Sequence, residues 1–138
     1  MDLSKILSIS GKNGLYRLVN QGKNNIIVES LENGMRTPAF SHDGIATLDN
    51  ISIFTYEDDV TLESVFQNIY RKENGAATPD FGNDSAKMRA YFEEILPNYD
   101  KERVYVSNIK KVYAWYNLLI KHNLVDLEEK KKDNKEEA

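Results

Sequence analysis

A wide apolar helical stripe at residues 107–123 constrains the fold of this chain more than any other stretch. Apolar side chains recur there at the three- and four-residue spacing of one helix face: Ile109, Val112, Tyr113, Tyr116, Leu119 and Ile120. At about 100° per residue, Trp115 and Leu118 widen the stripe to about 220°. We expect a helix this apolar to be covered from two sides, as the central helix of the C-terminal half.

Two shorter amphipathic patterns precede this helix and predict its partners. The first has Thr61 as its expected N-cap and ends at Asn74-Gly75. The second begins near Asp84 or Ser85 and stops at Pro97. A linker of about ten residues leads to Ser107, the expected N-cap of the central helix, and is too long for the tight turn of a helix-turn-helix DNA reader.

The N-terminal part of the chain predicts short strands joined by tight turns. Strand-forming residues are concentrated at 15–20, 26–31, 35–40 and 51–55. Asn33-Gly34 suits a tight hairpin, and Pro38 predicts an edge or a bulge because it donates no ladder hydrogen bond. We expect one helical turn at 3–7, capped by Asp2, another at 45–48, and a closing strand at 51–55.

These patterns together predict an α+β protein. Residues 1–56 form a small SH3-like β-barrel or a curled antiparallel sheet, packed on a three-helix unit at 57–127. Residues 128–138 are charged, with no apolar residue before the final alanine, and we expect them to be a disordered tail.

Charge is distributed unevenly along the chain. The formal net charge is −4, and residues 57–104 hold five more acidic than basic side chains, whereas the central helix carries three lysines and no acidic residue. An acidic chain lacks the broad positive surface of a typical nucleic-acid-binding protein. The chain has no cysteine, no secretory signal at its start and no stretch that predicts a membrane span, so we expect a soluble cytoplasmic protein.

Histidine and carboxylate patterns do not predict a catalytic site, so we do not expect an enzyme. His42 has an aspartate beside it, but adjacent side chains rarely aim at one another, and no second histidine lies at a ligating spacing. We expect His122 to cap the central helix, whose dipole favours a cation at that end. Neighbouring carboxylates such as Asp58 and Asp59 do not converge on one point, and residues 11–14 lack the spacing of a phosphate-binding loop. We therefore expect no catalytic residue, no metal and no cofactor.

Four stretches resemble a family of small proteins from Bacteroidetes-type bacteria that is catalogued only as a domain of unknown function. They are KILSISGKNGLYRLV, the IIVESLENGMR hairpin, the DNISIFT strand and VSNIKKVYAWYNLLIK. The resemblance implies a cytoplasmic bacterial protein with a β N-terminal part and a helical C-terminal part. It implies no activity, cofactor or site residue.

The best functional hypothesis is a non-enzymatic binding or adaptor module whose partner is a protein. Its groove would lie between the β part and the central helix, where a partly exposed tryptophan beside lysines suits a partner peptide. The candidate partner-binding residues are Tyr16, Arg17, Arg36, Lys110, Lys111, Tyr113 and Trp115.

Two alternatives stay open. In the first, a nucleic acid binds the arginines of the β part together with Lys110, Lys111 and Lys121, and the binding weakens steeply with salt. In the second, the wide helix stripe is covered by a second copy of the chain, in a self-associating structural protein.

Overall fold

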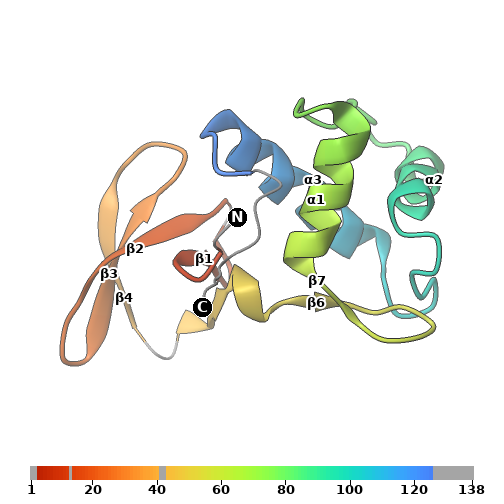
Figure 1. Cartoon of the computed structure of the whole chain (residues 1–138). Helices are drawn as coiled ribbons and strands as arrows, with labels where there is room; N and C mark the ends of the chain where they lie inside the picture. The colour runs from red at the N-terminus through yellow and green to blue at the C-terminus, as the bar shows by residue number, and fades with distance from the viewer. Residues whose placement is uncertain (1–2, 13, 41–42, 126–138) are drawn as a thin grey trace, which may run out of the picture. The chain divides into compact units, whose positions relative to one another are not determined.

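The computed structural model describes residues 3–12, 14–40 and 43–125. The chain divides between Ile51 and Ser52 into two compact units, which we name the β unit and the helical unit and describe separately. Figure 1 labels most of their elements. The predicted α+β class is confirmed, because an antiparallel sheet is followed by three helices. No helix in the described ranges is long and apolar enough to cross a membrane.

The sheet of the β unit has five antiparallel strands in the order β4-β3-β2-β1-β5. The strands are β1 (Ile6–Ile9), β2 (Tyr16–Gln21), β3 (Asn25–Ser30), β4 (Arg36–Phe40) and β5 (Ile45–Thr47). Strands β4 and β5 are both edges in the part of the chain that is described, so the sheet is open: the chain adopts the curled-sheet alternative and not the closed barrel. Pro38 lies on edge strand β4, as predicted. An edge strand tolerates a residue without an N–H, because it pairs with a neighbour on one side only.

The curl of this sheet gathers apolar side chains on its inner face. The pairing of β2 with β3 shifts between Leu18 and Asn20, which makes a bulge that bends the strand. Four buried residues form the inner cluster: Leu7, Ile9, Val28 and Ala39. Ala39 of edge strand β4 belongs to this cluster and Ile45 of edge strand β5 packs against it, so the two edges curl toward a common core.

Two short segments of the β unit differ from the prediction. The helical turn expected at 3–7 is instead a turn leading into β1, where Ile6 pairs with Arg17. The turn expected at 45–48 is β5 followed by the 3-10 turn η2 (Leu48–Asn50). Three or four apolar residues fit a helical and an extended period equally well, and this explains both errors. The predicted cap Asp2 lies outside the described residues.

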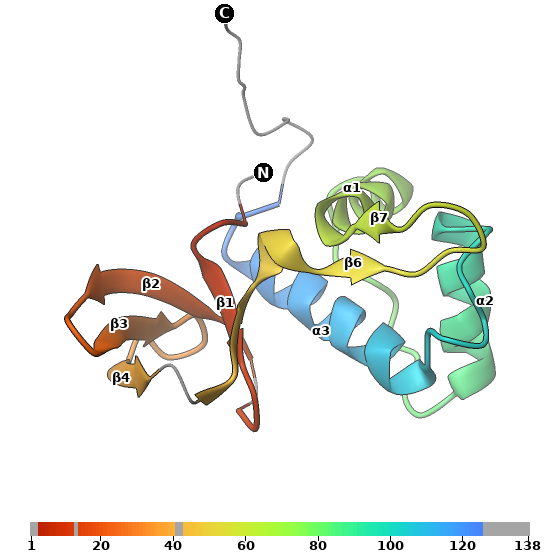
Figure 2. The same cartoon turned by 90° about the horizontal axis from the view of Figure 1, so that it is seen from below.

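The strand expected at 51–55 forms, but it belongs to the helical unit. There β6 (Ser52–Ile53) pairs with β7 (Val60–Thr61) in a separate two-stranded sheet, which Figure 2 shows from below. The prediction that this strand closes the N-terminal sheet is therefore wrong. Strand periodicity identifies an extended segment but not the strand with which it pairs.

Three helices complete the helical unit: α1 (Leu62–Glu73), α2 (Ser85–Ile95) and α3 (Val106–Lys121). The side chain of Thr61 accepts a hydrogen bond from the Ser64 N–H, which confirms the predicted cap of α1. The helix then ends at Asn74 in the left-handed conformation. The predicted cap of α3 is wrong by two residues, because α3 follows Tyr105, whose N–H donates to the Asn108 side chain over 2.9 Å.

Aromatic rings fill much of the interior of the helical unit. Phe92 of α2 meets Tyr99 edge-on with ring centroids 5.0 Å apart, and Phe66 of α1 lies 6.2 Å from Tyr116 of α3. All four side chains are almost completely buried. The apolar stripe predicted for α3 is thus core, and α1 and α2 supply its neighbours.

Candidate functional site

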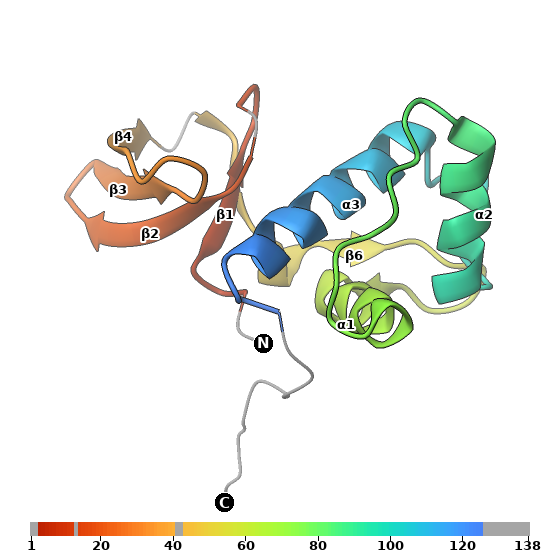
Figure 3. The same cartoon turned by 90° about the horizontal axis from the view of Figure 1, so that it is seen from above.

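A cleft of about 250 Å³ lies beside α3 in the helical unit. One wall is the segment that links α1 to α2, which runs over α3 as Figure 3 shows. The lining residues are Thr78, Pro79, Asp80, Phe81, Gly82, Met88, Lys110, Tyr113 and Asn117.

Side chains of α3 fix the linking segment in place. The Tyr116 hydroxyl donates to the Ala76 carbonyl over 2.8 Å. The Asn117 side-chain amide makes two hydrogen bonds with Thr78. Its oxygen accepts from the Thr78 N–H over 2.9 Å, and its nitrogen donates to the Thr78 hydroxyl over 3.1 Å. Burial, with the charge of Glu73 adding, raises the pKa of Tyr116 to about 12, so this hydroxyl stays a donor at neutral pH. The wall is therefore held by defined hydrogen bonds.

The floor of the cleft is aromatic. The ring of Phe81 lies 5.2 Å from that of Tyr113 and 5.3 Å from that of Tyr91, measured between centroids. The Tyr113 hydroxyl donates to the Met88 carbonyl over 2.7 Å, and burial raises the pKa of this tyrosine. Tyr113 therefore offers the cleft its ring and not its hydroxyl.

One acidic and one basic side chain stand at the rim. Asp80 accepts a hydrogen bond from the Gly82 N–H over 2.9 Å, in a turn where Gly82 has a φ of +57°. Lys110 is exposed, and its ammonium group forms no ion pair with a described residue. The rim thus combines a carboxylate that is hydrogen-bonded within its own loop with a cation that has no ion-pair partner in the described part of the chain.

Of the four predicted residues on α3, two meet in the cleft. Lys110 and Tyr113 are one helical turn apart and both line it. Lys111 is exposed, but it belongs to another face of α3, together with half-buried Trp115 four residues further on. The structure therefore separates Lys111 and Trp115 from the site that holds the other two.

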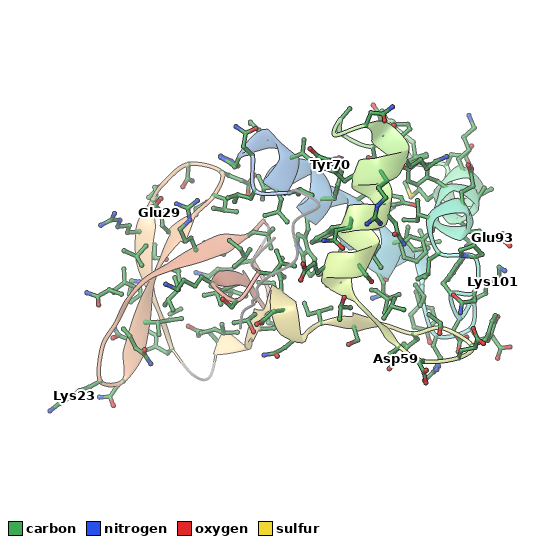
Figure 4. The ribbon with its side chains drawn as sticks, viewed as in Figure 1. Lys23, Glu29, Asp59, Tyr70, Glu93 and Lys101 are labelled. Carbon is green, nitrogen blue, oxygen red and sulfur yellow. The ribbon has the colours of Figure 1, made fainter. Side chains whose placement is uncertain are left out.

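The predicted residues of the β unit lie on two faces of its sheet. Tyr16 packs against the inner cluster. Arg17 and Arg36 flank Glu29 across the strands, so the three share the opposite face; Figure 4 labels Glu29. The Arg36 Nε lies 3.1 Å from a Glu29 carboxylate oxygen, which partly neutralises this pair of arginines.

Of the nine residues that line the cleft, the sequence prediction named only Lys110 and Tyr113; Asn117 and Phe81 are the most informative of those that it missed. Asn117 lies seven residues after Lys110 within the apolar stripe of α3. An amide inside such a stripe signals a hydrogen-bond partner beyond the helix, because buried polar groups are almost always bonded. Phe81 lies in a loop without periodicity, and no sequence signal points to it.

The described part of the chain contains no group of three or more histidine and carboxylate side chains that could hold a metal ion. His122 is the C-cap residue of α3, at the position predicted for it. His42 lies outside the described residues.

Comparisons with known proteins give two matches to family models and one to a solved structure. Residues 3–48 match the model described as Domain of unknown function (DUF5606), and residues 51–119 match Domain of unknown function (DUF6852). The chain is 40% identical to a protein from Bacteroides vulgatus, a structural genomics target solved by NMR in solution. That match covers 91% of this chain and 90% of the other, with a TM-score of 0.70. Among curated proteins no match was found.

Proposed function

This chain belongs to the family of the domain of unknown function DUF6852 and also matches DUF5606 over residues 3–48, and we propose for it a non-enzymatic cytoplasmic role in which it binds a segment of another protein. The cleft beside α3 receives one apolar side chain of that segment. The observation that carries the proposal is that Lys110, which has no ion-pair partner among the described residues, lines a cleft that also has aromatic side chains and a wall held by hydrogen bonds.

The size of the cleft favours a side chain over a free small molecule. Pockets for metabolites and drug-sized ligands span about 300–1,000 Å³. The cleft, at about 250 Å³, falls below that range but has room for a single aromatic or branched aliphatic group. A protein segment supplies such a group on a backbone that continues past the rim.

The polarity of the cleft defines the chemistry of the segment. Phe81, Met88 and Tyr113 favour an apolar anchor, and aromatic contacts of this kind dominate many protein interfaces. Lys110 favours an acidic residue next to that anchor. We therefore expect a partner segment that combines one aromatic or aliphatic anchor with a neighbouring carboxylate.

The charges of the helical unit support a protein partner more than a nucleic acid. Lys72 pairs with Glu94 over 2.8 Å and Lys101 with Glu93 over 3.2 Å, so these cations are already neutralised. Binding to phosphates requires several free cations along one track. Together with the net charge of −4, these ion pairs argue against a broad phosphate-binding surface on the helical unit.

Selection from a random peptide library displayed on phage tests the proposal, with the full chain as bait. The expected peptides share one aromatic or aliphatic position beside Asp or Glu. When such a peptide is added to the 15N-labelled chain, the side-chain amide signals of Asn117 and the backbone amide of Thr78 should shift. The same peptide with alanine at its anchor is the control and should leave these signals in place.

The alternatives predict different results in this titration. A single-stranded oligonucleotide that shifts Lys110, Lys111 and Lys121 together, and loses affinity steeply with salt, would replace the protein-binding proposal with nucleic-acid binding. Shifts at the cleft that depend on protein concentration without any peptide would indicate self-association. Selected peptides that share no apolar position would also contradict the proposal.

A further inference from the structure

The chain that leaves β6 exposes two aromatic rings on one side. Side chains alternate there as in a strand: Ile53 and Thr55 are 7% and 1% exposed, whereas Phe54 and Tyr56 are 40% and 58% exposed. Phe54 and Tyr56 therefore point away from the core of the helical unit. With Asp58 and Asp59 from the turn that follows, we call this surface the aromatic face.

Backbone hydrogen bonds fix the aromatic face to the segment between α2 and α3. The Tyr56 N–H donates to the Asn98 carbonyl over 2.9 Å, and the Asp100 N–H donates to the Phe54 carbonyl over 3.0 Å. The Thr55 hydroxyl also holds the turn, because it donates to the Asp58 carbonyl over 2.7 Å. Both rings are thus carried by paired backbone and not by a free loop.

Two cations beside the aromatic face, Arg103 and Lys101, already have carboxylate partners. The Arg103 guanidinium stacks on the Phe54 ring at 4.3 Å and bonds to Asp100 over 2.8 Å. That bond, with the charge of Asp59 adding, raises the pKa of Arg103. Lys101 forms an ion pair with Glu93 over 3.2 Å. Figure 4 labels both residues, at the end of the unit where Asp59 lies.

The two carboxylates of the aromatic face have no direct partner among the described residues, although the charge of Asp59 acts on Arg103. Among the described residues, none donates a hydrogen bond to the side chains of Asp58 and Asp59, and neither is in an ion pair. The surrounding sequence is also the most acidic part of the chain, with the excess of five acidic residues at 57–104. An anionic partner such as a phosphate backbone or an acidic lipid surface is repelled by this arrangement.

We propose that the aromatic face binds a cationic segment of a partner protein. A lysine or arginine of that segment packs on the exposed ring of Tyr56 and pairs with Asp58 or Asp59. Aromatic rings attract cations through their negative faces, and adjacent carboxylates strengthen this attraction. Exposed rings gathered on one rigid surface are also typical of interaction sites.

This second surface goes beyond the proposed function of the cleft. The two sites share no residue, and their charges select opposite partners: within the described ranges, neither Lys110 of the cleft nor the carboxylates of Asp58 and Asp59 are in an ion pair. One helical unit can therefore hold an acidic segment and a basic segment at once, as an adaptor requires.

A peptide of eight alternating lysine and glycine residues tests the aromatic face by NMR titration of the 15N-labelled chain. We expect the amide signals of Phe54, Tyr56 and Asp59 to shift, while the side-chain amide of Asn117 in the cleft stays in place. The matching glutamate–glycine peptide should cause no shift at the aromatic face. Affinity should fall as salt rises, because exposed charges are screened.

Two comparisons of matched variants distinguish a defined binding site from general electrostatic attraction between the lysine–glycine peptide and the acidic chain. Asp58→Asn and Asp59→Asn should each weaken binding about two- to fivefold, whereas Glu32→Gln, which removes an exposed carboxylate of the β unit, should change it less than about 1.5-fold. Tyr56→Phe keeps the ring and should retain binding, whereas Tyr56→Ala should lose it. Equal losses in the three carboxylate variants, shifts at other residues or no shift at all would overturn the proposal.

Discussion

At the scale of single residues, Asp100 shows how one buried carboxylate organises a segment of irregular backbone. It accepts hydrogen bonds from the Glu102 N–H over 2.9 Å and from the Arg103 N–H over 3.2 Å. The Arg103 side chain donates a third hydrogen bond to this carboxylate over 2.8 Å. The Arg103 bond is the main cause that lowers the pKa of Asp100 from its ordinary value of 3.8, and the backbone donors add to it. The segment that carries Arg103 to the Phe54 ring therefore depends on an ionised Asp100.

This shift of the Asp100 pKa predicts a pH-dependent effect of Asp100→Asn. A carboxylate whose pKa is lower in the folded state contributes stability above its unfolded pKa of 3.8, and this stability is lost as the pH falls below that value. The substitution should therefore lower the free energy of unfolding more at pH 7 than at pH 2.5, as measured by urea titration. Glu102→Gln, two residues away, is the control and should show no such difference. An equal loss at both pH values would contradict the assigned role of Asp100.

At the scale of secondary-structure elements, α3 acts as the support for the rest of its unit. Tyr113, Tyr116 and Asn117 lie at the spacing of one helix face, and each bonds to backbone outside the helix. Together they hold α2 and the link before it, and so form the cleft. The helix thus contributes the wall, the floor and the free cation of the candidate site.

Asn117→Ala tests this support, because it leaves the Thr78 N–H without its acceptor. Loss of one partner of a part-buried hydrogen bond costs about 1–2 kcal/mol, so the free energy of unfolding should fall by that amount. Hydrogen exchange at the Thr78 amide should become faster, whereas exchange at the Tyr56 amide should not change. Lys111→Ala on the same helix is the control for helix propensity and should leave both amides unchanged. Unchanged exchange at Thr78 in the Asn117 variant would show that the link is held by other contacts.

At the scale of the whole molecule, features that depend on neighbouring residues can be predicted from the sequence, whereas pairing between distant segments cannot. Thr61 and Asn74 mark the ends of α1 as predicted, because capping depends on a few neighbouring residues. The partner of β6 was predicted wrongly, since pairing depends on the path of the chain and not on the strand itself. The same limit applies to the cleft: Lys110 and Tyr113 were named from one helix, but Phe81 enters from a loop whose position depends on Asn117.

The most direct test of the proposed cleft compares Lys110→Glu with Lys111→Glu for a peptide obtained by selection against the full chain. The two substitutions make the same charge change at neighbouring exposed positions of α3, but only Lys110 lines the cleft. The dissociation constant from isothermal titration calorimetry should rise at least about threefold for Lys110→Glu and stay within about 1.5-fold of the wild type for Lys111→Glu. An equal loss in both variants would contradict a defined cleft and indicate general attraction to the lysines of α3, and no loss in either would place the partner elsewhere on the molecule.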